Sequence, residues 1–192
     1  MRRIPVSVVW LAGSVPFGVL LWDTLQGQLG VDPVRDIEHR LGRTAVYLLL
    51  ATLAVTPLLR LSRVNLVRFR RALGLLSFSY AVLHLLAWAV LDMGLLWGQA
   101  LRDIVKRPYL TIGMAAWLIL AILAATSSNR AIRALGPRWK ALHRLVYLAA
   151  PLAILHWLMA YKIWPSWALW MGLALAILLA LRLPGLRKLR VR

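Results

Sequence analysis

The sequence has no cysteine and few acidic residues. The absence of cysteine in the 192-residue chain excludes disulfides, thiolate metal sites, iron–sulfur ligation and a thiol relay. Only 6 residues are Asp or Glu, against 24 Lys and Arg. No carboxylate pair falls inside an apolar run and no glycine-rich phosphate loop is present, which argues against a proton-coupled pump and against a hydrolase. Any electron carried by this chain needs a carrier other than a thiol.

Apolar residues, by contrast, are in excess. Hydrophobic residues make up 61% of the chain and charged residues 16%, and the mean hydropathy is +0.73. Average soluble domains are about half apolar and about a quarter charged, so this composition excludes an ordinary water-soluble globule. The 10 tryptophans suit a protein with two membrane–water interfaces. The composition predicts an all-α membrane protein.

Six apolar runs are close to the roughly 20 residues that a helix needs to cross a bilayer. These runs are Ile4–Leu25, Thr44–Leu61, Ala72–Leu91, Tyr109–Ala125, Leu145–Tyr161 and Ser166–Leu183. The first could be read as a signal peptide, but it continues apolar beyond the small residues that a cleavage site would use. The sequence therefore predicts a six-transmembrane-helix bundle, formed as a single domain over residues 1–192.

The positive charges indicate an orientation. The N-terminus, the second and fourth connections and the C-terminus together hold 17 of the 24 Lys and Arg residues, and the acids lie at the first and third connections. By the positive-inside rule, both termini are expected in the cytoplasm. We expect no nucleic-acid binding, because no folded basic domain is present. The basic clusters, including Arg187 to Arg190 in the tail, are expected to lie against anionic membrane lipid.

Two of the four histidines are predicted at one depth. His84 lies 14 residues after Arg70, so it rises about 21 Å on a helix that enters from the cytoplasm. His156 lies 13 residues after His143, which begins the fifth run, and rises about 20 Å. The third and fifth runs cross in the same direction, so both imidazoles are expected in the outer half of the membrane.

Each of these histidines shares a helical stripe with small residues. The stripes are Gly74, Ser77, Ala81 and His84, and Ala149, Ala153, His156 and Ala160. Small stripes usually serve close helix packing, but an imidazole is costly to bury without a partner. A flat porphyrin between the two helices uses both features, so the pattern predicts haem with these two histidines as axial iron ligands. Hydrogen-bonded structural histidines and zinc are the alternatives, although zinc normally takes three or four protein ligands.

His143 lies in a basic segment at the cytoplasmic entrance to the fifth run. A second, inner haem would need another ligand at that level, where the third run offers only Arg70 or Arg71. Three interpretations stay open: a ligand with an unusual partner, a contact to quinone or flavin, and an interfacial histidine. Arg70, Arg71, Arg138 and Lys140 are the candidate quinone or flavin contacts beside it.

His39 precedes the second run on the outer side, where the sequence predicts a solvated loop histidine. The alternatives are a contact to the haem edge and a contact to a partner protein. Trp88, one turn beyond His84, is expected in the aromatic belt, with stacking on the porphyrin as the alternative.

Several stretches, in order and spacing, carry a resemblance to a known family. They are Asp32-Pro33-Val34 through His39, Gly42-Arg43-Thr44-Ala45, Thr56-Pro57, Arg70-Arg71 with Leu73-Gly74, His84, Arg107-Pro108-Tyr109, Thr126-Ser127, Trp139 through His143, and Val146-Tyr147. Over nearly its whole length the chain resembles the MsrQ (YedZ) family, the haem-binding membrane subunits of bacterial periplasmic methionine sulfoxide reductase systems.

The resemblance implies an electron-transfer subunit of the bacterial inner membrane. Such a subunit takes electrons from the quinone pool or a flavin and passes them through haem b to a periplasmic molybdopterin-containing methionine sulfoxide reductase, which repairs oxidised proteins. The family is also described as using FMN. Carried over residue by residue, its haem histidines fall on His84, His143 and His156.

The chain departs from the wider ferric reductase and NADPH oxidase superfamily in one position. Those relatives carry two histidines on the third span, and this sequence has Arg70 at the inner one, so one complete haem is expected and a second is in question. The chain ends eleven residues after Leu181, so the flavin and nicotinamide domain of larger relatives is not expected. Two other function classes stay open: a non-redox membrane anchor or assembly subunit with structural histidines, and, less favoured, a small-solute transporter.

Overall fold

The computed structural model describes residues 4–182, and within them it is all helical. The segment from Arg187 to Arg190, which was predicted to lie against membrane lipid, and Leu183 of the sixth run lie outside the described residues. The elements are α1 (Val6–Leu25), α2 (Pro33–Ser62), η1 (Val67–Phe69), α3 (Arg70–Ala87), the π-helical turn η2 (Trp88–Asp92), α4 (Trp97–Lys106), α5 (Pro108–Ala125), α6 (Asn129–Leu135), α7 (Pro137–His143), α8 (Val146–Met159) and α9 (Ser166–Ala180).

Five segments of this bundle are long and apolar enough to cross a membrane. They are Val6–Leu25, Pro33–Ser62, Val67–Asp92, Pro108–Ala125 and Pro137–Met159. The sixth predicted run forms a shorter apolar helix, α9, of 15 residues. The structure therefore confirms an all-helical membrane protein with five candidate spans, and crossing by α9 stays a prediction.

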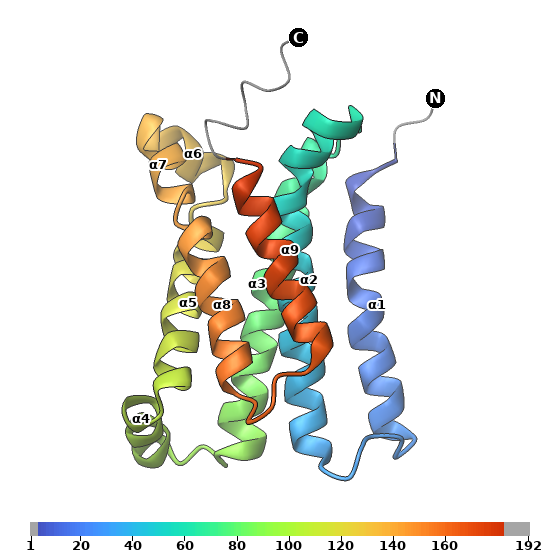
Figure 1. Cartoon of the computed structure of the whole chain (residues 1–192), viewed down its shortest axis with the longest axis vertical. Helices are drawn as coiled ribbons and strands as arrows, with labels where there is room; N and C mark the ends of the chain where they lie inside the picture. The colour runs from blue at the N-terminus through green and yellow to red at the C-terminus, as the bar shows by residue number, and fades with distance from the viewer. Residues whose placement is uncertain (1–3, 183–192) are drawn as a thin grey trace.

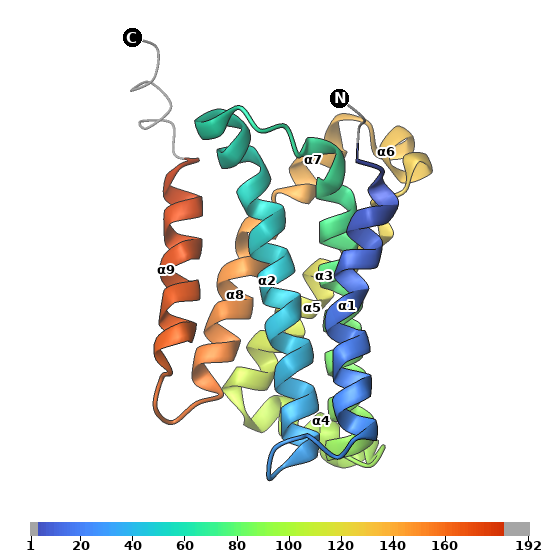
Figure 2. The same ribbon diagram turned by 90° about the vertical axis from the view of Figure 1, so that its right-hand side faces the viewer.

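The long helices run side by side and alternate in direction (Figures 1 and 2). The starts of α1 and α3, the end of α9 and the short helices α6 and α7 share one end of the bundle, which we call the basic end. The connection from α1 to α2 and helix α4 lie at the opposite end. We call this the acidic end, because all six Asp and Glu residues of the sequence fall on or beside these segments.

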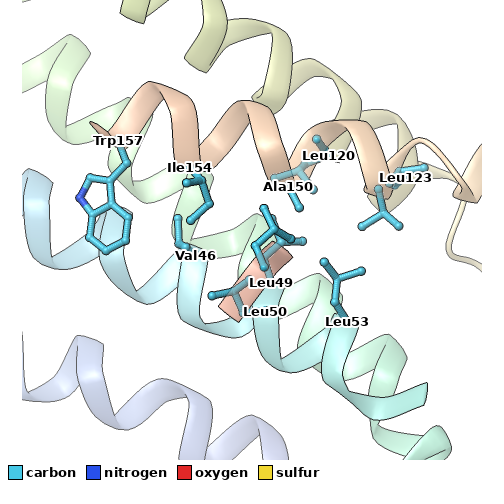
Figure 3. Packing of buried hydrophobic residues seen from close by; sticks show 12 residues of the cluster. Val46, Leu49, Leu50, Leu53, Leu120, Leu123, Ala150, Ile154 and Trp157 are labelled. Atoms are coloured by element: carbon cyan, nitrogen blue, oxygen red, sulfur yellow. The ribbon is translucent and has the colours of Figure 1, made fainter. Parts of the chain in front are cut away.

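The core is packed from four helices. Val46, Leu49 and Leu53 of α2 form one buried cluster with Leu120 of α5 and Ile154 of α8 (Figure 3). Leu175 of α9 belongs to the same cluster. Leu53 is fully buried. The closest helix pairs are α2 with α3 and α5 with α8. The molecule is thus built on two helix pairs, and the histidines of α3 and α8 lie between them.

Helix α2 begins earlier than the sequence analysis expected. It starts at Pro33 rather than Thr44, because the Asp32 side chain accepts a hydrogen bond of 3.1 Å from the N–H of Arg35 and proline occupies the first turn. Arg40 pairs with Asp36 at 2.9 Å and with Asp23 of α1 at 2.5 Å, so the charged first turns are neutralised locally. As a result, the segment expected to be a loop is helical.

The fifth predicted run corresponds to α8, and a turn separates it from His143. His143 ends the short helix α7, and α8 begins at Val146. Helices α7 and α8 together make up one candidate span, Pro137–Met159. The distance of His156 from the basic end is set by α8 together with this break.

The Tyr80 hydroxyl group joins α3 to α1. It donates a hydrogen bond of 2.7 Å to the Gly13 carbonyl and accepts one of 3.0 Å from the Phe17 N–H. These two backbone groups are one helical turn apart and flank Pro16, where the ladder of α1 lacks a donor. Most large apolar side chains of α1 face outward, so this bridge is a specific polar attachment for a helix with little buried surface.

Candidate functional site: two histidines across a cavity

The structure brings His84 and His156 together at the acidic end of the bundle. Their ring centres are 6.2 Å apart, and the ring planes cross at 68°. An imidazole nitrogen binds a metal at about 2 Å, so two rings on opposite sides of one metal ion have centres about 6 Å apart. The spacing is therefore compatible with one iron held between the two side chains.

Both imidazoles are held in the tautomer that a metal needs. His84 Nδ1 lies 2.9 Å from the Glu38 carbonyl oxygen, and His156 Nδ1 lies 2.7 Å from the Tyr109 carbonyl oxygen. A carbonyl oxygen only accepts, so each Nδ1 carries the proton and donates it. The lone pair is then on Nε2, the atom that ligates iron in a histidine anchored in this way.

Each ring also lies against a glycine of the neighbouring helix. A Cβ atom on Gly42 would be 3.4 Å from Nδ1 and Cε1 of His84. A Cβ atom on Gly113 would be 2.6 Å from Nδ1 of His156. Sequence reasoning missed both contacts, because they join residues on different helices.

A cavity of about 400 Å³ adjoins both histidines, a size typical of cofactor sites. Four of the predicted small residues line it, namely Ser77, Ala81, Ala153 and Ala160. Gly74 and Ala149, the far members of the two stripes, are outside its lining: Ala149 is fully buried in the core, and Gly74 faces Thr52. The half of each stripe nearest the histidine thus borders open space, and the other half packs helices. Trp88 also lines the cavity, one turn beyond His84.

Two buried polar atoms on the cavity lining have no hydrogen-bond partner within residues 4–182. They are Oε1 of Glu38 and Nε1 of Trp117. Buried polar groups are normally paired, so this pattern indicates that a polar ligand belongs in the cavity. Arg35 and Arg43 line the same cavity and supply positive charge, beside the carboxyl groups of Asp32, Glu38 and Asp92. A porphyrin with an apolar ring and two carboxylates suits this set of residues.

The described chain offers little support for a bare metal ion. Within residues 4–182 no three His, Asp or Glu side chains come together as a metal site. Zinc takes three or four protein ligands, whereas a haem iron already has four porphyrin nitrogens and needs only axial ones. The two-histidine site therefore fits haem better than zinc.

His39 is not in a solvated loop, so that prediction is wrong. It lies in the second turn of α2, where the helix extends beyond the predicted run, and it is half-buried. Its Nδ1 is 3.2 Å from the Tyr161 hydroxyl, and the two rings pack 5.4 Å apart. His39 lines the cavity, which agrees with the alternative of a place at its edge.

His143 lies apart from the other histidines, at the basic end. Its ring stacks on Trp139 at 4.0 Å, and its Nε2 is 3.1 Å from the Thr126 hydroxyl oxygen. That hydroxyl donates its hydrogen to the Ile122 carbonyl at 2.7 Å, so it accepts from His143, whose Nε2 then carries a proton. In this arrangement Nδ1 is the ring nitrogen of His143 that keeps a lone pair.

The four residues that were predicted to contact quinone or flavin lie at the same end of the bundle as His143. Arg70 and Arg71 begin α3, and Arg138 and Lys140 are on α7, all four exposed. Arg71 donates a hydrogen bond of 2.8 Å to the Asn129 side chain. These residues form an exposed basic surface, on the opposite side of the bundle from the two-histidine cavity.

Comparison with known families identifies the class. Residues 41–154 match the family of the ferric reductase like transmembrane component, and this range holds α2 from its third turn through most of α8. His84 and His143 fall inside the match, and His156 lies two residues beyond it.

Individual relatives narrow the class. The chain is 46% identical over 159 residues to proteins from Brucella ovis, Brucella canis and Brucella melitensis, each named protein-methionine-sulfoxide reductase heme-binding subunit MsrQ. The aligned region covers 83% of this chain and 72% of each relative. The chain therefore belongs to the ferric reductase-like transmembrane family and, within it, to the MsrQ heme-binding subunits.

Proposed function

We propose that this chain is a cytochrome b-type electron-transfer subunit that holds one haem b between His84 and His156. The observation that carries the proposal is the pair of imidazoles 6.2 Å apart, each with Nδ1 donating to a backbone carbonyl and Nε2 free to ligate. The cavity beside them and its unpaired polar atoms support the same conclusion. The MsrQ relatives are named as heme-binding subunits.

The haem would supply one-electron chemistry, and the chain supplies ligation and environment. His84 and His156 would ligate the iron through their Nε2 atoms. Arg35 and Arg43 would neutralise the propionates at the mouth of the cavity, and Ser77, Ala81 and Ala153 leave room for the ring. The backbone carbonyls of Glu38 and Tyr109 fix the tautomer and the orientation of the two imidazoles.

The same proposal includes an orientation in the bacterial inner membrane. Helix α9 would be the sixth span, with both termini in the cytoplasm, because the positive charges concentrate at the basic end. The haem site would then lie toward the periplasm. Electrons would leave at the acidic end to a periplasmic molybdopterin-containing methionine sulfoxide reductase. The relatives are named as heme-binding subunits of a protein-methionine-sulfoxide reductase.

The electron donor would be membrane quinone or a flavin such as FMN, at the opposite face. The exposed basic residues around His143 support this assignment, because a quinone head group or a flavin phosphate is attracted by positive charge. Arg70, Arg71, Arg138 and Lys140 are the proposed contacts, and His143 is either a donor contact or the ligand of a second haem.

Purified protein tests the proposal directly. We expect a reducible Soret band, and quantification of haem and flavin per polypeptide gives the number of each cofactor. Protein that stays colourless after expression with added haem would instead favour the non-redox anchor, in which the histidines only hydrogen-bond between helices.

A further inference from the structure

We propose that Gly113 is a positioning residue that sets a haem ligand by letting the His156 imidazole lie directly on the backbone of α5, and that Gly42 is its roomier counterpart beside His84. This inference rests on the proposed function and goes beyond it, because it assigns a role to two residues that neither ligate nor carry a polar side chain. It also ranks them: Gly113 is indispensable, and Gly42 tolerates a methyl group.

The contacts follow one design in both halves of the site. His84 of α3 donates to the carbonyl of Glu38, and its ring lies on Gly42, one turn further along α2. His156 of α8 donates to the carbonyl of Tyr109, and its ring lies on Gly113, one turn further along α5. In each case the anchoring carbonyl is four residues before the glycine.

The spacing of ligand and glycine along the chain is also nearly the same. Gly42 precedes His84 by 42 residues, and Gly113 precedes His156 by 43. Helices α2 and α5 run in one direction and α3 and α8 in the other (Figures 1 and 2). Each helix pair is therefore a self-contained holder: one helix carries the ligand, and the other carries the carbonyl and the glycine. Because the arrangement occurs twice, we infer that the glycine is part of what holds the histidine in each helix pair.

A side chain at Gly113 would occupy the place of the ring. In both halves of the site the imidazole reaches a helical carbonyl at 2.7–2.9 Å, beside a residue one turn later that has no Cβ. At Gly113 a Cβ would be 2.6 Å from Nδ1, 2.9 Å from Cε1 and 3.0 Å from Cγ of His156. A ring is rigid, so alanine at this position forces His156 away from its anchor.

The Gly42 position is less crowded. A Cβ there would be 3.4 Å from Nδ1 and Cε1 and 3.7 Å from Cγ of His84, which is ordinary van der Waals contact. Gly42→Ala should therefore leave both ligands in place. The two halves of the site have the same arrangement of carbonyl, glycine and histidine, but only the Gly42 half has room for a methyl group. This difference between the two alanine variants can be measured.

The test compares Gly113→Ala, Gly42→Ala and the control Gly74→Ala in the full-length protein. Gly74 is in α3, where a Cβ would meet only Thr52, at 3.8 Å. We expect Gly113→Ala to lose the six-coordinate low-spin haem spectrum, with either five-coordinate haem or a severalfold lower haem content. Added imidazole should restore the low-spin spectrum of the haem that stays bound. Gly42→Ala and Gly74→Ala should keep the wild-type spectrum. Alanine is the better helix former, so a loss at Gly113 does not arise from helix propensity.

A double variant separates positioning from general misfolding. In a His156→Ala background the ring is gone, so adding Gly113→Ala should lower neither the haem content nor the melting temperature further. A further fall in that background would overturn the proposal, because it would show that Gly113 acts through something other than His156. A Gly113→Ala protein with a wild-type spectrum would overturn it equally. Wild-type protein without haem would instead refute the proposed function on which it rests.

Discussion

His84 and His156 face each other from two different helix pairs, with ring centres 6.2 Å apart and ring planes crossed at 68°. Neither ring depends on the other for its orientation, because each is anchored to a carbonyl of its own pair. Helix α3 packs mainly on α2, and α8 on α5, so a metal ion between the rings would join the two pairs.

Removing either ring should remove the haem. For His84→Ala and for His156→Ala we expect haem affinity to fall at least about tenfold, the loss typical of even an outer partner of a metal ligand. The measurement is the Soret absorbance per polypeptide, with His39→Ala as a comparison, since His39 borders the cavity and bonds to Tyr161. A full-strength spectrum in either alanine variant contradicts the ligand assignment.

The crossed ring planes should be visible in the ferric protein. Two iron d orbitals can accept electron density from the imidazole rings. Rings with parallel planes donate to only one of these two orbitals, which separates the orbitals in energy. Rings with crossed planes donate to both orbitals and leave them nearly equal in energy. We therefore expect a strongly anisotropic low-spin electron paramagnetic resonance signal. An ordinary rhombic signal would mean that the rings become parallel around the iron.

His143→Ala distinguishes one haem from two. The variant loses a hydrogen bond to Thr126 and the stacking on Trp139, so we expect a loss of about 1–2 kcal/mol in stability with unchanged haem per polypeptide. Thermal unfolding and a pyridine haemochrome assay measure the two quantities. If haem per polypeptide falls by half, His143 ligates a second haem.

Arg35→Gln tests the charge at the cavity mouth. A guanidinium group near the iron disfavours the more positive ferric state, so its removal should lower the midpoint potential; the exposure of Arg35 keeps this effect small. Arg107→Gln is the matched control, because Arg107 is exposed at the same end, pairs with Asp103 at 3.3 Å and is outside the cavity lining. Equal potentials in all three proteins would show that Arg35 has no influence on the haem.

Tyr80→Phe tests the attachment of α1. The variant removes the hydroxyl that bridges Gly13 and Phe17, and we expect a cost of about 1–2 kcal/mol because this group is buried. Ser79→Ala is the control, since its exposed hydroxyl only bonds the Leu75 carbonyl within the same helix. Melting temperature in detergent reports the difference, and an unchanged value for Tyr80→Phe would show that packing alone holds α1.

The sequence predicted the long apolar helices well, because hydropathy decides which segments enter a membrane. It failed where polar residues are helical. The first turns of α2 carry Asp36 and Arg40, which neutralise each other, and α4 has only one buried residue, Ala100. The signal for the earlier start of α2 was present in Asp32-Pro33, an N-cap followed by proline.

The proximity of the two histidines was predictable for a similar reason. Helical rise fixes depth, so His84 and His156 could be placed at one level from spacing alone, and the structure places their ring centres 6.2 Å apart. The glycines were not predictable, because no local pattern states which helix packs on which. His39 was misplaced along with the start of α2.

The anchors of both imidazoles are main-chain oxygens, at positions 38 and 109. Mutation at those two codons replaces the side chain and leaves the acceptor in place, so the tautomer of each ring does not depend on which side chain stands there. The constraint falls instead on the codon for Gly113, one helical turn after Tyr109, where a Cβ would lie 2.6 Å from the ring that the carbonyl holds.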